Sequence, residues 1–340
     1  MFRLGVGILQ RFPPDELVPL VEWCERLGYD QLWYANEKFY RDPWVGLTLA
    51  ALHTQRVRLG TFVADPYTIH PALTAIAIAS LDEVSHGRAM LLLGAGGAGA
   101  APLGVPRTRP ARAIAEAIDL TRQLLAGKEV DFQGEVIQFR HGKLAFSPPR
   151  ADIPIYVASR GDVVLSTAGA VADGVMLATY ATPAGVRHGL DRVQRGAQRA
   201  GRRLEDLELF SRVDTCVSDD PSAAQAAVRP MVARLLGSSY PDRSFVHALG
   251  LEVPPEFEEV ARHRSPERNT AHAHLIPDEL VRAFTWAGTG EQVAEQIAAI
   301  ADLGLRNITM LPHPSPSEDV HVTIRAFAEQ VRPRVEALLR

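Results

Sequence analysis

Runs of consecutive apolar residues recur along this chain and alternate with segments whose apolar residues fall at helical spacing. Ala89–Leu93 is one such run, and its lack of polar positions is typical of a parallel strand covered on both faces. From Ala72 the apolar positions recur at helical spacing until Gly87, where a helix is expected to end. The pattern predicts eight strands, which are Arg3–Leu9, Gln31–Ala35, Val57–Val63, Ala89–Leu93, Ile155–Ala158, Gly174–Ala178, Leu207–Val217 and Asn307–Leu311.

Helices are predicted between these strands. Their expected ranges are Pro13–Leu27, Pro43–Thr54, Ala72–Gly87, Arg112–Leu125, a helix opened by Ser159–Asp162, Pro183–Ala200, Pro221–Leu236, Gly288–Ala301 and Glu318–Leu339. Strands and helices in such alternation favour one topology, a (β/α)8 TIM barrel that forms a single domain over residues 1–340. Catalytic residues are then expected where strands end, at the carboxyl face of the barrel.

Two segments do not fit the alternation, and we interpret both as insertions in the barrel. Residues 126–154 contain VDFQGEVIQF, whose alternation around Gly134 predicts a small hairpin. Residues 237–286 are polar and contain several prolines, which predicts an irregular segment with short helical pieces before the last helix–strand unit.

Composition narrows the class of protein further. The chain is 46% hydrophobic, which supports a large core, and no apolar run is long enough to span a membrane. A net charge of −4 gives no indication of the basic surface that a nucleic-acid-binding protein needs. Cys24 and Cys216 are too few for a disulfide framework, and Met1 leads into a strand without a secretory leader. We expect a cytoplasmic α/β protein.

The end of the fifth predicted strand has the composition of an anion site. Ala158, Ser159, Arg160 and Gly161 come between the strand and the first turn of the next helix. Backbone N–H groups at a helix start, a serine hydroxyl and a guanidinium together favour a phosphate. The alternative is an ordinary helix cap with a solvated arginine.

A loop of glycine and alanine follows the fourth predicted strand. Residues 94–99, GAGGAG, satisfy G-x-G-x-x-G, but Pro102, Pro106 and Pro110 keep the chain irregular where a dinucleotide fold needs a helix. We interpret the loop, with Gly94 at its start, as kept free of side chains so that a ring system can approach the backbone. The alternative is a flexible barrel loop.

Polar residues also follow the second and third predicted strands. Glu37, next to Asn36, is a candidate proton donor or a polar group that binds the edge of a ligand. The alternative interpretation is that Glu37 is an ordinary solvated carboxylate. Asp65 and His70 face the same end of the barrel and are secondary candidates, although His70 precedes a proline and could serve only a backbone group.

Metal-dependent and hydrolytic chemistry find little support in the sequence. His263, His272 and His274 lack the spacing of a known metal site, so no metal is expected. The chain has no G-x-S-x-G motif, and neither cysteine lies at a strand end.

Most of the chain, roughly residues 1–235 and 285–340, resembles a known family. The blocks TFVADPYTIHPALTAIAIASLDEVSHGRAMLLLGAG, LLAGKEVDFQGE, PIYVASRG and ADGVML are similar to those of the bacterial luciferase-like oxidoreductases. Within that superfamily they most resemble the branch that uses the deazaflavin coenzyme F420, of the methylenetetrahydromethanopterin reductase type. The resemblance implies a luciferase-like TIM barrel with a flavin or deazaflavin at its carboxyl mouth, and a cis peptide bond at Phe62–Val63 that forms a bulge behind the ring.

The resemblance also implies roles for individual residues. Asn36 and Glu37 would face the ring or the substrate, with Glu37 as the best placed general acid and Asp65 and His70 as lesser candidates. The implied cofactor contacts are Phe62, Val63 and Ala64 behind the ring, Gly94 and Gly96 beside it, and Ala158, Ser159, Arg160 and Gly161 at the phosphate.

The leading functional hypothesis is an F420-dependent oxidoreductase that transfers a hydride between the deazaflavin and a small organic substrate. One alternative is an FMN-dependent two-component monooxygenase fed by a separate reductase, and another is a non-catalytic flavin-binding relative. The acidic oligoglutamyl tail of F420 would need a basic groove, which Arg107, Arg109 and Arg112 could provide if they are not merely solvated. We also expect a homodimer, because the third predicted helix, ALTAIAIASL, is apolar nearly all round.

Overall fold

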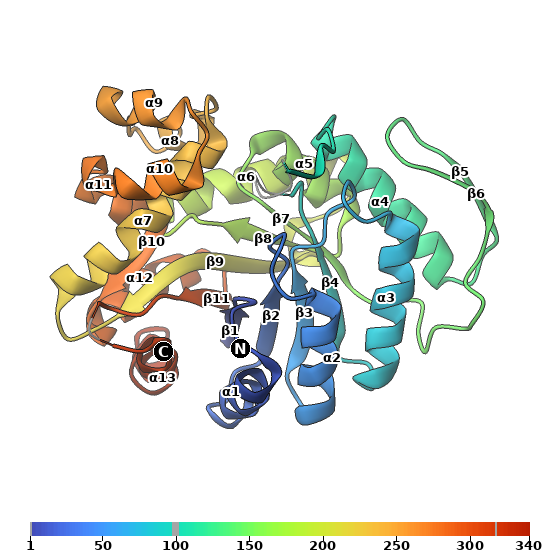
Figure 1. Ribbon diagram of the computed structural model, residues 1–340, viewed down its shortest axis with the longest axis horizontal. Helices are drawn as coiled ribbons and strands as arrows, with labels where there is room; N and C mark the ends of the chain where they lie inside the picture. Colours follow the sequence, from blue (N-terminus) through green and yellow to red (C-terminus); the bar gives the residue numbers. More distant parts are fainter. Residues whose placement is uncertain (1, 97–101, 317) are drawn as a thin grey trace.

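The structure is a barrel of parallel strands surrounded by helices (Figure 1). The computed structural model describes residues 2–96, 102–316 and 318–340. Within them the main sheet has nine strands in the order β10-β9-β11-β1-β2-β3-β4-β7-β8, and a further pairing of β8 with β9 closes it. These strands are β1 (Arg3–Ile8), β2 (Gln31–Ala35), β3 (Arg58–Phe62), β4 (Ala89–Leu93), β7 (Ile155–Ser159), β8 (Gly174–Ala178), β9 (Glu208–Val217), β10 (Thr285–Gly288) and β11 (Asn307–Pro312).

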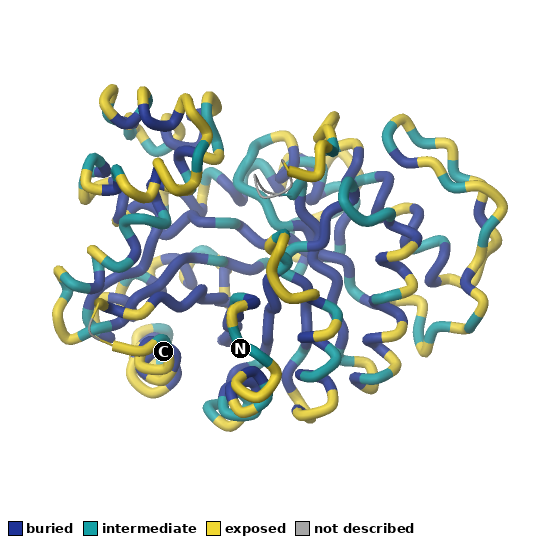
Figure 2. Tube along the Cα trace, viewed as in Figure 1, coloured by how far each residue is buried: buried dark blue, intermediate teal, exposed yellow. Residues whose placement is uncertain are grey.

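The predicted (β/α)8 barrel is confirmed, and its interior is filled by side chains. Six residues from five strands form one buried cluster across the barrel axis, namely Trp33, Met90, Leu92, Tyr156, Met176 and Phe210. Figure 2 shows the strands buried along their length and the outer faces of the helices exposed. Because both faces of each strand are covered, the continuous apolar runs of the sequence are explained.

The helices form the outer layer. The longer ones are α1 (Pro14–Arg26), α2 (Pro43–His53), α3 (Pro71–Val84), α4 (Pro110–Leu125), α5 (Asp162–Val171), α6 (Pro183–Arg199), α7 (Pro221–Ser239) and α12 (Gly290–Ala301). Most begin with proline in the first turn, where its missing N–H needs no partner. The predicted closing helix is interrupted, because a π-helical turn at Phe327–Val331 separates α13 (Val320–Ala326) from α14 (Arg332–Leu338). No helix in the described residues is long and apolar enough to cross a membrane.

One strand of the sheet was not predicted. β10 pairs in parallel with the last four residues of β9, from Thr285↔Asp214 to Gly288↔Val217. The prediction assigned most of β10 to the irregular segment and placed a helix start at Gly288. The ten-residue β9 makes the additional pairing possible, since its first half pairs with β8 and its last half is free on that side.

Short helices occupy the segment between α7 and β10. They are α8 (Ser244–His247), α9 (Pro255–Ala261), α10 (Pro266–Ala271) and α11 (Asp278–Phe284), and Figure 1 shows them together beside the mouth of the barrel. Phe245, Phe257 and Phe284 are fully buried among them, which gives this segment an apolar centre continuous with the main core.

A hairpin follows α4. β5 (Val130–Gln133) and β6 (Gln138–Gly142) pair antiparallel, and the turn between them is fixed by one carboxylate. The Glu116 carboxylate accepts hydrogen bonds from the N–H groups of residues 135, 136 and 137 at 2.7–3.0 Å. A side chain at Gly134 would collide with Glu116, since its Cβ would lie 2.3 Å from Oε2.

Candidate active site

A cavity of about 570 Å³ opens at the carboxyl ends of the barrel strands. The predicted site residues that line it are Asn36, Glu37, Phe62, Val63, Asp65, Gly94, Gly96, Ala158, Ser159, Arg160 and Gly161. Two predicted residues do not line it: Ala64 is buried behind the wall, and His70 lies outside the cavity. Residues 97–99 of the predicted glycine loop lie outside the described residues.

The wall formed by β3 and β4 is a backbone ridge. The Phe62–Val63 peptide bond is cis, as the family resemblance implies. The ridge is fixed from both sides, because Asn36 Nδ2 donates to the Val63 carbonyl at 2.9 Å and the Ala64 N–H donates to the Leu92 carbonyl at 2.9 Å. Gly94 faces this ridge, and a Cβ there would lie 2.7 Å from Val63 Cγ2. The lack of a side chain at Gly94 lets the end of β4 pack directly against Val63.

The end of β7 presents a cation without a counter-ion. The Arg160 guanidinium donates to Ser239 Oγ at 2.7 Å and lies 5.4 Å from the centre of the Phe245 ring. No carboxylate among the described residues lies within ion-pair distance of it. Burial, the largest cause, lowers the pKa of Arg160 to about 10, with Arg212 and Arg107 acting in the same direction and Tyr180 and Asp242 acting against it. A half-buried guanidinium without an ion pair at a cavity wall is a site for an anion.

The first turn of α5 supports this anion site. Gly161 is the N-cap, and its N–H donates to Ser159 Oγ at 3.1 Å. Asp162, the first helical residue, would repel an anion, but its carboxylate is paired with His188 at 2.8 Å and Arg192 at 2.9 Å. Asp162 does not line the cavity, so its own carboxylate does not oppose an anion on the mouth side of the helix N-terminus.

The carboxylates of the cavity differ in their surroundings. Burial raises the pKa of Asp65, but hydrogen bonds from Thr68 and Lys38 outweigh it and hold that pKa below its usual range. Its ion pair with Lys38 measures 2.9 Å. Asp65 is therefore a charged group that fixes the turn after β3. Glu37 is exposed in the cavity and forms no ion pair within the described residues, and its N–H donates to Gln10 Oε1 at 2.6 Å.

His70 has a structural position. Its ring accepts from the Ala72 N–H at 3.2 Å as the N-cap of α3, and its Nε2 lies 2.9 Å from the Gln138 carbonyl oxygen of the hairpin. These contacts connect α3 to β6 rather than to the cavity.

Several cavity residues are not among those expected from the sequence. Lys38, Arg212, Asp242 and Phe245 all line the cavity, together with Arg107, which the sequence suggests only for an acidic tail. Arg212 is the most informative of them, because arginine and aspartate at positions 212 and 214 of a strand share one face. Two charged residues at alternate positions of a largely buried strand are a signal in the sequence.

Arg212 belongs to a buried charged network. Asp214 accepts from Arg212 at 2.9 Å and lies 2.7 Å from His313 Nε2, and the Arg212 guanidinium is 5.4 Å from the Phe62 ring. Burial raises the pKa of Asp214, but Arg212 and His313 outweigh it and lower it to about 2. The network fixes Arg212 in the wall opposite the β3–β4 ridge.

No group of three or more His, Cys, Asp or Glu side chains comes together as a metal site within residues 2–96, 102–316 and 318–340. The fold and the cavity define a barrel protein whose carboxyl mouth has a backbone ridge on one wall and a basic helix start on another, an arrangement suited to a flat ligand with an anionic group. The model of the luciferase-like monooxygenase family matches residues 2–307, and the chain belongs to this family.

Several relatives that match nearly the whole chain come from the F420-dependent branch. A 5,10-methylenetetrahydromethanopterin reductase of Archaeoglobus fulgidus is 29% identical over 98% of this chain and 100% of its own length. An F420-dependent glucose-6-phosphate dehydrogenase of Beutenbergia cavernae is 30% identical over 99% and 98% of the two chains. The solved F420-dependent tetrahydromethanopterin reductase of Methanopyrus kandleri superposes with a TM-score of 0.85, at 25% identity, over 98% of this chain and 99% of its own. The predicted family and branch are confirmed.

Proposed function

We propose that this protein uses its mouth cavity to bind coenzyme F420 and a small organic substrate for hydride transfer. It is an F420-dependent oxidoreductase, as are the relatives that match its full length. The observation that carries the site assignment is Arg160, a guanidinium without a carboxylate partner at the start of α5. The coenzyme has a phosphate, and a phosphate would supply the missing negative charge.

The residues present fit this cofactor. Ser159, Arg160 and Gly161 would hold the phosphate, while Val63, packed against Gly94, would form the ridge behind the flat ring. F420 supplies an obligate hydride donor or acceptor when it is bound. The chain's own contribution is to orient the ring and to exclude water, for which Leu9, Leu311 and the Phe62 ring provide apolar cover.

Glu37 is the proposed proton-transfer group. Its carboxylate lines the cavity without an ion pair to a described residue, whereas Asp65 is held ionised by Lys38 and Thr68. Glu37 would hold a proton for the substrate atom that gains electrons, and Asn36, which supports the Val63 carbonyl, would remain a positioning residue.

Binding experiments test the proposal. We expect the apo-protein to bind F420 with quenching of its fluorescence, and the loaded protein to bleach the deazaflavin absorbance with a substrate from a panel. The panel includes the substrates named by the relatives, methylenetetrahydromethanopterin and glucose 6-phosphate, and simple secondary alcohols. Glu37→Gln should lower turnover about 100-fold and alter its pH profile while leaving F420 affinity unchanged. Unaltered turnover and pH profile would remove Glu37 from this role.

The same experiment separates the alternatives. FMN-dependent oxygen consumption in the presence of a flavin reductase would instead support the two-component monooxygenase. Binding of either cofactor without turnover of any panel member would support a non-catalytic relative. The proposal predicts F420 binding that is at least tenfold tighter than FMN binding.

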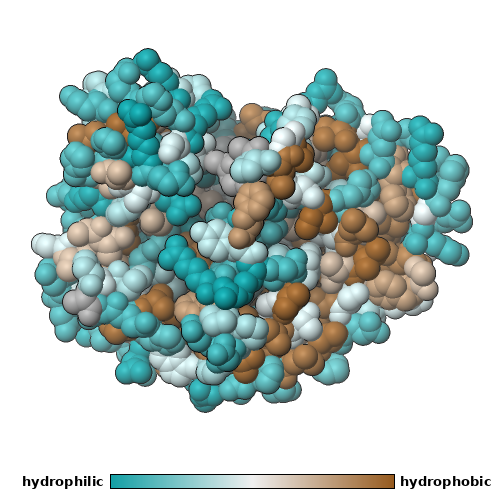
Figure 3. All heavy atoms as spheres, viewed as in Figure 1, coloured by the Kyte–Doolittle hydropathy of each residue, from teal (hydrophilic) through white to brown (hydrophobic). Residues whose placement is uncertain are grey.

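We also propose that the protein acts as a homodimer through α2 and α3. Val45, Leu52, Leu73 and Ile76 are exposed on these helices, and Figure 3 shows hydrophobic groups gathered over this face. Large aliphatic side chains on two neighbouring helices form the kind of patch that another protein surface covers. The helices pack against each other in one protomer, so a second copy would meet a fixed surface.

A further inference from the structure

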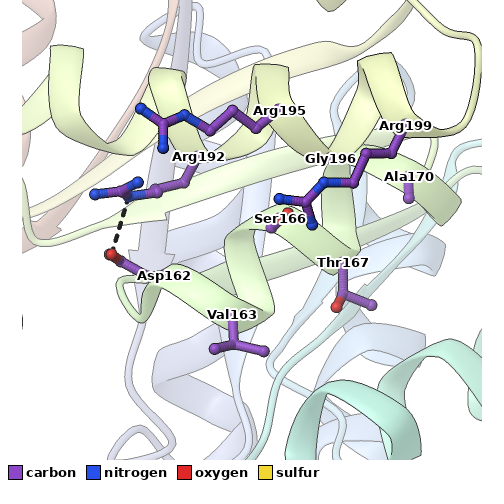
Figure 4. A pocket seen from close by; sticks show the side chains of 9 residues that line it. All are labelled: Asp162, Val163, Ser166, Thr167, Ala170, Arg192, Arg195, Gly196 and Arg199. Atoms are coloured by element: carbon purple, nitrogen blue, oxygen red, sulfur yellow. Dashed lines mark ion pairs between the residues drawn. The ribbon is translucent and has the colours of Figure 1, made fainter.

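A second cavity, of about 390 Å³, lies between α5 and α6 on the outside of the barrel (Figure 4). We call it the α5–α6 groove, and its lining includes Asp162, Val163, Ser166 and Thr167 on α5. The first turn of α5 separates it from the mouth, because Val164 lines the mouth while Val163 lines the groove. The two cavities therefore lie on either side of this turn, next to the proposed phosphate site.

The groove is basic along the α6 side. Arg192, Arg195 and Arg199 lie three and four residues apart, so that they share one face of the helix, and Figure 4 shows all three side chains along the groove. Arg192 pairs with Asp162 at 2.9 Å and Arg195 pairs with Asp191 at 3.0 Å. No described carboxylate lies within ion-pair distance of Arg199. Arg195 and Arg199 are exposed, so further anions can reach them.

The floor of the groove is rigid. Gly196 of α6 lies directly against α5, and a Cβ there would come within 1.7 Å of the Ser166 carbonyl oxygen. Gly169 of α5 makes the reciprocal approach, with a Cβ position 2.1 Å from the Val193 carbonyl oxygen. Because backbone meets backbone at both points, the two helices that carry the arginines and the hydroxyls of Ser166 and Thr167 keep their positions relative to each other.

The other candidate basic cluster is already neutralised. Arg109 pairs with Glu135, and Arg112 pairs with both Glu116 and Glu135 at 2.9 Å. These contacts fix the hairpin turn to α4. Of the three arginines expected from the sequence to serve an acidic tail, Arg107 alone lines the mouth.

We propose that the α5–α6 groove binds the oligoglutamyl tail of F420. The inference rests on the proposed function, since the tail begins where the coenzyme's phosphate ends. From the phosphate the tail would cross the first turn of α5 and follow the groove, where Asp162 is neutralised by His188 and Arg192. One helical turn, about 5.4 Å, brings it to the level of Ser166. There its carboxylates would meet Arg195 and Arg199.

Coenzyme forms with tails of different length test the inference. Affinity is measured from fluorescence quenching for a form that ends at the phosphate, a form with a short tail and a form with a long tail. We expect the long tail to improve affinity of the wild type about tenfold in low salt, and the gain to shrink in high salt. The double variant Arg195→Gln/Arg199→Gln should lose this gain while keeping its affinity for the tail-less form.

Two further variants make the outcome specific. Arg187→Gln removes one exposed charge from α6 at a position that does not line the groove, and it should keep the full gain. Equal affinity for all tail lengths, or a gain that Arg107→Gln removes and the double variant keeps, overturns the inference. If the tail-less form does not bind at all, the proposed function fails, and the inference fails with it.

Discussion

Replacing Arg160 by methionine is expected to stabilise the apo-protein slightly while abolishing most of its affinity for F420. The fall in the pKa of this guanidinium from 12.5 to about 10 corresponds to a burial penalty of at most about 3 kcal/mol. The hydrogen bond to Ser239 and the contact with the Phe245 ring each offset about 1 kcal/mol of it. The net gain in the free energy of unfolding for Arg160→Met is therefore roughly 0–1 kcal/mol.

The ligand-bound state should respond in the opposite direction. A charge-assisted hydrogen bond to a phosphate contributes about 1.5–3 kcal/mol, so Arg160→Met should weaken F420 binding roughly 10- to 150-fold. Urea denaturation of the apo-protein measures the first effect, and fluorescence titration with F420 measures the second. The two measurements together distinguish a ligand-binding arginine from a structural one.

Arg212→Met is the matched control, because Arg212 is also a guanidinium in the cavity wall but has a carboxylate partner. Its removal leaves Asp214 buried with only His313, and the free energy of unfolding should fall by about 3 kcal/mol. The reasoning is refuted if Arg160→Met destabilises the apo-protein by more than about 1 kcal/mol, or if it binds F420 as tightly as the wild type.

Three other predictions follow from contacts in the structure. Asp214→Asn should lower the free energy of unfolding at pH 7 by about 3 kcal/mol, because Arg212 is left buried without its carboxylate. The pKa of Asp214 is about 2 in the folded protein and about 4 in the unfolded chain. The difference in the free energy of unfolding between the wild type and Asp214→Asn should therefore be complete above pH 5 and disappear as the pH falls toward 2. A difference in urea denaturation that does not change with pH would contradict this. Gly94→Ala should weaken F420 binding about tenfold by pushing Val63 out of place, and the added change Val63→Ala should restore part of the affinity. Unchanged titrations would show that the ring does not rest on the Val63 ridge. Leu73→Glu should convert the dimer to a monomer in light scattering, and a wild type that is itself monomeric would remove the proposed interface.

Most of the barrel could be predicted from the sequence because its strands are buried on both faces. Such strands have no polar positions, so Ala89–Leu93 and Gly174–Ala178 stand out between helices with strong periodicity. β10 is different, since TWAG has four residues and directly follows α11 without a turn residue. It is a strand because β9 is long enough to offer an unpaired edge, which is a property of the assembled sheet.

The candidate site shows the same division. Residues that follow strands in sequence, such as Ser159 and Arg160, could be assigned to the cavity because parallel strands end at one face. Asp65 could also be assigned to the cavity, but its ionisation state could not be predicted, because its ion pair with Lys38 depends on how two loops meet. Phe245 could not be found at all, because a segment far along the chain returns to cover Arg160.

The length of β9 has a consequence for how such an enzyme could change its choice of substrate. α7 leaves from the end of β9, and the chain comes back as β10 beside the same four terminal residues. Both ends of the segment between β9 and β10 are thus anchored on β9. The pairing of β8 with β9, which closes the barrel, does not involve this segment. That segment can be grafted from one relative to another as a single cassette, provided that an aromatic ring is retained where Phe245 covers Arg160.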